Sequence, residues 1–91
     1  MRTIEICLHF PAPDDAVRFE ATFKEFLRTV PGTAGREPGV EYREADEAVW
    51  LLGTLSLGTD DDRSVRRVQQ SVRTWTAQHE DVIAVTMLPE L

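Results

Sequence analysis

The sequence predicts a single α+β domain, residues 1–91, in which two helices cover one face of a four-stranded antiparallel sheet. Three observations lead to this fold class. The chain has 91 residues, enough for one small domain. Apolar residues recur with the periods of strand, helix, strand, strand, helix and strand, in that order. Two right-handed crossovers around a central hairpin then give the strand order 4-1-3-2, which is the ferredoxin-like plait. That fold carries many unrelated functions.

The N-terminal third predicts a strand and then a helix. Residues 4–10 alternate between apolar and polar side chains, as a half-buried strand does. Asp14 or Asp15 is expected to cap the following helix, because a carboxylate suits the positive end of a helix. Pro31-Gly32 ends it. The apolar positions of this helix are Ala16, Phe19, Phe23, Phe26, Leu27 and Val30.

The remaining elements are two strands, a second helix and a final strand. Strands are expected at Val40–Glu44 and Val49–Leu57, joined by a polar turn. Asp60–Asp62 forms the acidic start of the second helix, and Asp81–Leu88 closes the chain as a strand. The expected apolar stripe of the second helix is Val65, Val68, Val72 and Trp75, with His79 in its last turn.

In this fold the helices leave one face of the sheet bare. The strand at 49–57 is apolar on both faces in its first half, which is unusual for a strand with one face in water. The covered face is predicted to hold Ile4, Ile6, Leu8, Phe10, Val49, Leu51, Leu55, Leu57, Ile83, Val85 and Met87. The bare face is predicted to hold Glu5, Cys7, His9, Trp50, Leu52, Thr54, Ser56, Val82, Ala84, Thr86 and Leu88.

Antiparallel pairing of the two central strands places His9 beside Trp50. The last strand adds two small apolar residues, so the bare face is expected to carry an apolar patch around one histidine. Such a patch usually marks a partner or ligand. The alternative is that the loop at 31–39 or the C-terminal residues fold over it. The candidate interface or ligand residues are Cys7, His9, Trp50, Leu52, Val82 and Ala84.

The sequence offers little catalytic chemistry. Cys7 and His9 lie two apart on one strand, about 6–7 Å between Cα atoms, which is far for a thiol–imidazole hydrogen bond. Trp75 and His79 share a helix face and could line an alternative pocket, although such a pair more often belongs to the core. Two histidines and one cysteine show no ligand spacing, so neither a metal nor a cofactor is expected.

Charge and composition restrict the partners. A net charge of −6 argues against nucleic acid and anionic membranes. The second helix carries Arg63, Arg66, Arg67 and Arg73, which we interpret as a solvated face pairing with acidic neighbours. An acidic set, Glu37, Glu41, Glu44, Asp46 and Glu47, either protects a sheet edge or attracts a basic partner.

A single cysteine and the lack of a signal peptide or membrane span indicate a cytoplasmic protein. Nine of the ten basic residues are arginine, a bias that suggests a bacterial source. We therefore predict a non-catalytic binding or regulatory domain that forms a homodimer through its bare sheet face and presents acidic loops to a protein partner. Two alternatives are a ligand-binding protein or cofactor-independent enzyme of the dimeric α/β-barrel type, with His9, Trp50, Trp75 and His79 lining its pocket, and an immunity or antitoxin-like protein.

Overall fold

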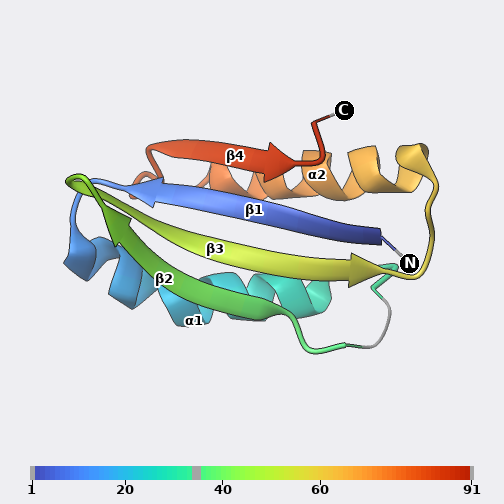
Figure 1. Cartoon of the computed structure of the whole chain (residues 1–91), viewed down its shortest axis with the longest axis horizontal. Coiled ribbons are helices and arrows are strands. Elements are labelled where there is room, and N and C mark those ends of the chain that lie inside the picture. The colour runs from blue at the N-terminus through green and yellow to red at the C-terminus, as the bar shows by residue number, and fades with distance from the viewer. Residues whose placement is uncertain (1, 34–35, 91) are drawn as a thin grey trace.

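The computed structural model describes residues 2–33 and 36–90 and contains six elements (Figure 1). Their order is strand, helix, strand, strand, helix, strand, as the apolar periodicity predicts. The elements are β1 (Arg2–Phe10), α1 (Pro13–Thr29), β2 (Gly39–Ala45), β3 (Ala48–Leu57), α2 (Asp62–Thr76) and β4 (Ala84–Leu88).

The strands form one antiparallel sheet in the order β2-β3-β1-β4. Both helices lie behind the sheet in Figure 1, so its other face is open. The α+β class and the four-stranded antiparallel sheet are therefore confirmed, and the strand order is consistent with a ferredoxin-like plait.

The core lies between the sheet and the helices. Alternate residues of β1 and β3 are buried, and α1 packs on them with side chains spaced three or four residues apart. Gly53 interrupts the apolar alternation of β3, and the ring of Phe23 from α1 lies directly over it. The main buried side chains are Ile4, Ile6, Leu8, Phe10, Phe19, Phe23, Leu27, Leu51, Leu55, Leu57, Val65 and Val72.

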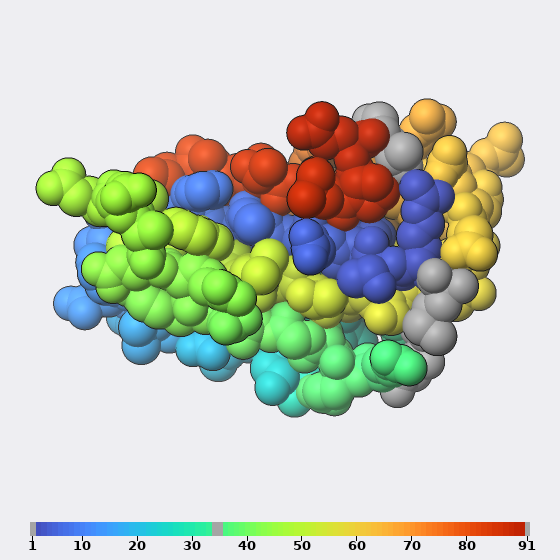
Figure 2. Space-filling model, viewed as in Figure 1, coloured from blue at the N-terminus to red at the C-terminus, as the bar shows by residue number. Residues whose placement is uncertain are grey.

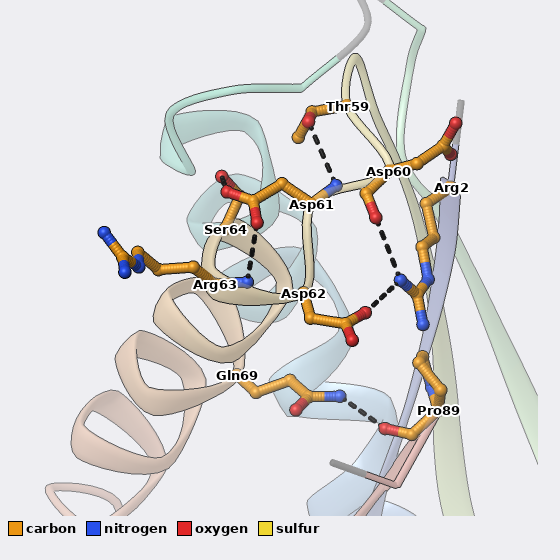
Figure 3. A network of polar contacts seen from close by, with 9 residues as sticks. All are labelled: Arg2, Thr59, Asp60, Asp61, Asp62, Arg63, Ser64, Gln69 and Pro89. Carbon is orange, nitrogen blue, oxygen red and sulfur yellow. Dashed lines mark hydrogen bonds and ion pairs between the residues drawn. The ribbon is translucent and has the colours of Figure 1, made fainter.

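Polar contacts hold the start and the middle of α2 against the sheet (Figure 3). The Asp61 carboxylate accepts a hydrogen bond from the backbone N–H of Arg63 and so caps the helix, as the acidic run predicts. Arg2 of β1 pairs with the Asp62 carboxylate. The buried side chain of Gln69 donates to the Pro89 carbonyl at 2.7 Å, which ties the chain beyond β4 to the middle of α2.

Two predicted helix ends are wrong by a few residues. The N-cap of α1 is Ala12, without a side-chain hydrogen bond, and not Asp14 or Asp15. Pro13 takes the first helical position, where its missing N–H costs no hydrogen bond. The second helix ends at Thr76, so His79 lies in the following turn and not in the last helical turn.

The last strand is shorter than predicted, because the chain is still turning at residues 80 and 81. The Val82 N–H donates to the His79 carbonyl, and the Ile83 N–H donates to the His9 carbonyl. Strand alternation therefore does not hold before Ala84. Val82 packs against the core and is not part of the open face, whereas Ile83 is 63% exposed and not buried under the helices.

Candidate functional site

The strand register places the open-face side chains in rows that cross the sheet. Direct partners across antiparallel strands point to the same face. In the first row His9 lies between Ala84 on β4 and Trp50 on β3, and Arg43 of β2 follows Trp50. In the second row the members are Thr86, Cys7, Leu52 and Glu41, and in the third they are Leu88, Glu5, Thr54 and Gly39.

The centre of this face is apolar. The rings of His9 and Trp50 lie 6.0 Å apart between centroids, at an angle of 33°. Cys7 and Leu52 occupy the next row directly beside them. Five of the six candidate residues therefore come together, and Val82 does not, for the reason given above. We call Cys7, His9, Trp50, Leu52 and Ala84 the open-face patch.

A polar rim surrounds the patch. Glu41 and Arg43, on edge strand β2, form an ion pair at 2.9 Å. Glu5 follows in the third row beside Leu88, which is 49% exposed. Atoms of the four strands make up this face, and no helix crosses it (Figure 2). An apolar centre with a charged rim is typical of protein–protein interfaces.

The loop between α1 and β2 runs along another part of the molecule. Thr33 forms a bridge with Leu57 at the far end of β3, and Glu37 pairs with Arg28 of α1 at 2.6 Å. Residues 34 and 35 of that loop lie outside the described residues. The described part of the loop thus lies beside the end of β3 and α1, away from the open-face patch.

Cys7 is not set up as a nucleophile. Burial raises the pKa of its thiol, and the negative charge of Glu5 raises it further. Both effects favour the neutral thiol, whereas nucleophilic catalysis needs the thiolate. The open face therefore offers a contact surface and no activated thiol.

The other candidate pair, Trp75 and His79, lies on the helix side of the sheet. The Trp75 ring stacks on Phe26 of α1 at 4.0 Å and 4° between planes. His79 meets Phe19 edge to face at 5.1 Å and Trp75 at 4.8 Å. These rings join α1 to α2. The sheet separates them from His9 and Trp50, so the four residues do not line one pocket within a single chain.

Three of the five carboxylates in the acidic set have an ion-pair or hydrogen-bond partner within the chain. Glu37 pairs with Arg28, Glu41 pairs with Arg43, and Glu44 accepts a hydrogen bond from the Tyr42 hydroxyl at 2.9 Å. The arginines of α2 differ. Within residues 2–33 and 36–90, no ion pair involves Arg63, Arg66, Arg67 or Arg73. The expectation that they pair with acidic neighbours is wrong.

Among the described residues, no three histidine, cysteine, aspartate or glutamate side chains lie close enough together to hold a metal ion. In the same part of the chain, neither helix is long and apolar enough to cross a membrane. Comparison with protein-family models, with curated proteins and with solved structures finds no match to this chain.

Proposed function

We propose that the chain is a cytoplasmic ferredoxin-like plait that acts as a binding or regulatory domain and pairs with a second copy through its open sheet face. The observation that carries this proposal is the open-face patch: an indole, a leucine, a thiol and an imidazole side by side on the two central strands, with charges only around them. A large apolar group at the centre of a contact is where binding energy concentrates.

The size of the face limits a dimer to a small interface. Four strands at about 4.8 Å spacing and some seven residues at about 3.3 Å each give a face of roughly 450 Å² per protomer. Two such faces bury roughly 900 Å² if the sheet is treated as flat, without the extra area of protruding side chains. This area approaches the lower end of the range that specific interfaces bury. The estimate fits a dimer of moderate affinity and not an obligate one.

The core of the chain is complete within one copy. Its accessible surface is 5573 Å², close to the roughly 5,400 Å² expected for a folded monomer of this mass. All the large fully buried side chains lie between the sheet and the helices. A variant that blocks pairing should therefore remain a folded monomer, so association can be tested separately from stability.

The experiment is size-exclusion chromatography with light scattering at tens of micromolar protein, for the wild type and for Trp50→Glu. We expect a dimer for the wild type and a monomer for the variant, because a buried carboxylate at the centre of the contact would lose its hydration. Val17→Glu is the matched control. It replaces an exposed apolar side chain on α1 with the same charge, away from the open face.

A wild type that stays monomeric in this range, or a dimer that Trp50→Glu leaves intact, would contradict the proposal. Circular dichroism of Trp50→Glu checks that the variant is folded. Fluorescence adds a second measurement in a Trp75→Phe background, where Trp50 is the sole indole. Its emission should shift to shorter wavelength as the protein concentration rises.

The hairpin tip supports a smaller part of the proposal, the presentation of acidic groups to a basic protein. Asp46 and Glu47 are exposed at the β2–β3 turn, which extends beyond the sheet (Figure 1). Unlike Glu37 and Glu41, they take part in none of the ion pairs found among the described residues. These two carboxylates are the acidic groups best placed to attract a partner.

A further inference from the structure

Helix α2 has a charge opposite to that of the rest of the chain. It carries four arginines and one aspartate, a net charge of +3, in a protein whose formal charge is −6, so the other residues together carry −9. The four arginines, Arg63, Arg66, Arg67 and Arg73, are all exposed. They lie on the helix side of the sheet, opposite the open-face patch.

The three aspartates at the start of this helix, Asp60–Asp62, form none of the ion pairs found among the described residues with its arginines. Asp62 pairs with Arg2 of β1, and Asp60 offers its backbone carbonyl to the same guanidinium at 3.1 Å. Asp61 is occupied as the helix cap. Figure 3 shows the side chain of Arg63 extending away from these groups. The positive charge of α2 is therefore available on the surface.

This arrangement lowers the stability of the helix itself. Arg63 lies in the first turn, where the helix dipole is positive and disfavours a cation. Arg63, Arg66 and Arg67 are three and four residues apart, which is the spacing at which like charges on a helix repel. A cluster that is unfavourable within the helix and forms no ion pair with the described residues points to a role outside the chain.

A shallow groove runs along these arginines to an aromatic residue. It has a volume of about 700 Å³ and is lined by Arg63, Arg66, Arg67, Gln70, Trp75 and Gln78, among others. Trp75 also borders a second hollow, on the α1 side, together with Phe26. Twelve residues separate Arg63 from Trp75, about 18 Å along the helix. The groove thus has a cationic end and an aromatic end.

We propose that this surface, the arginine groove of α2, binds an acidic polypeptide segment. Carboxylates of the segment pair with Arg63, Arg66 and Arg67, and an apolar side chain of the segment packs against Trp75. Charge complementarity supports an acidic partner. The net charge of −9 on the rest of the chain disfavours a nucleic acid, which would bring many phosphates close to those acidic groups. The site is separate from the open-face patch, so it does not depend on the proposed dimer.

The test uses a fluorescent helical peptide of about 16 residues. It has three glutamates spaced i, i+3 and i+4 at one end and leucines about three turns further on. A second peptide has glutamine in place of each glutamate, and a third probe is a single-stranded oligonucleotide. We expect fluorescence anisotropy to show binding of the acidic peptide, at least about tenfold weaker binding of the glutamine peptide, and weakening by added salt.

The variants assign the binding to the groove. The triple variant Arg63→Gln, Arg66→Gln, Arg67→Gln should weaken binding of the acidic peptide at least about tenfold. The triple variant Arg18→Gln, Arg28→Gln, Arg36→Gln removes the same charge elsewhere and should retain most of the affinity. The first variant should also melt at a temperature about 1–3 °C higher than the wild type, since it removes repulsion within α2.

Each other outcome overturns the proposal. Equal binding of the two peptides would show that the carboxylates do not contribute, and equal losses in both triple variants would show that only net charge matters. Tighter arginine-dependent binding of the oligonucleotide would make the groove a polyanion site. Absence of binding by the acidic peptide would exclude an acidic polypeptide as its occupant, and self-association that the α2 variant abolishes would make a second copy of the chain the occupant in place of a separate acidic segment. The Trp50→Glu variant should bind the peptide as the wild type does, which separates this result from the dimer test.

Discussion

Gly53 is the position in the sheet over which the Phe23 side chain of α1 packs. A Cβ atom built there would lie 2.5 Å from Cζ and 2.8 Å from Cε2 of Phe23, closer than such atoms approach in proteins. The Phe23 ring is fully buried over this position. Glycine is therefore needed at position 53 for lack of space, and not for a special backbone conformation.

Gly53→Ala should lower the free energy of unfolding by about 1–3 kcal/mol, because the added methyl group must displace a buried ring in a packed core. Gly58→Ala is the matched control, since the nearest atom to its added Cβ would be the Gly32 carbonyl oxygen at 4.0 Å. Urea unfolding measures both variants. Phe23→Leu should relieve part of the loss in the Gly53→Ala background. Equal stability of the two alanine variants would show that Phe23 does not limit this position.

Sequence patterns predicted single residues well where a strand period could be followed. The pairing of His9 with Trp50 follows from antiparallel neighbours and is confirmed. Val82 was misplaced because a turn interrupts the period before β4. The sequence shows that Gly53 interrupts the apolar alternation of its strand. The ring that packs over it belongs to Phe23, 30 residues earlier in the chain, and a local pattern cannot predict that contact.

Among the elements, the β2–β3 hairpin carries a local strain. Ala45 pairs with Ala48, so the turn has two residues, and both have positive φ: 49° at Asp46 and 67° at Glu47. Two-residue hairpins of this type favour Asn or Asp followed by Gly. Asp46 matches the preference for a short polar side chain, and Glu47 does not.

Glu47→Gly should therefore stabilise the protein by up to about 1 kcal/mol, since relief of the positive φ exceeds the extra entropy that glycine loses on folding. Glu47→Gln removes the charge and keeps the side chain, so it separates the electrostatic effect from the conformational one. Thermal and urea unfolding of the two variants give the comparison. If glycine stabilised no more than glutamine, the backbone at position 47 would be unstrained.

The helices show which element-level features a sequence can reveal. An acidic cap within Asp60–Asp62 was predicted, and the structure places it at Asp61, because capping is local. That the α2 arginines form no ion pair with the part of the chain that the structure describes was not predicted. Their obvious partner Asp62 is taken by Arg2, which lies 60 residues earlier and reaches it only through the fold. The spacing of residues along α2 cannot show that a distant arginine competes for the same aspartate.

At the scale of the whole molecule, the sheet separates two surfaces of different chemistry. One side has an apolar centre with charges around it, and the other has a cationic helix beside an aromatic contact between α1 and α2. The strands that build the core with one set of side chains present the open-face patch with the alternate set. A partner on one side therefore leaves the other side accessible.

Cys7 can report on what covers the open face. Its thiol pKa is raised by burial and by Glu5, so the folded thiol stays protonated at a pH where the unfolded thiol already ionises. Below the ordinary pKa of a thiol, Cys7 therefore has no effect on the free energy of unfolding. As the pH rises from that value through the higher pKa of the folded state, Cys7 lowers the free energy of unfolding. Alkylation requires the thiolate, so iodoacetamide should react more slowly with folded than with urea-unfolded protein between about pH 7 and pH 9.

Pairing through the open face would bury this thiol further, so the alkylation rate should also fall as the protein concentration rises. Trp50→Glu should remove the concentration dependence, and Glu5→Gln should shift the pH profile toward lower pH without removing it. Mass spectrometry of samples quenched at timed intervals measures the rate. An alkylation rate that does not depend on protein concentration in the wild type would place Cys7 outside any contact and would contradict a dimer formed through this face. A concentration dependence that survives in Trp50→Glu would place the contact elsewhere on the protein.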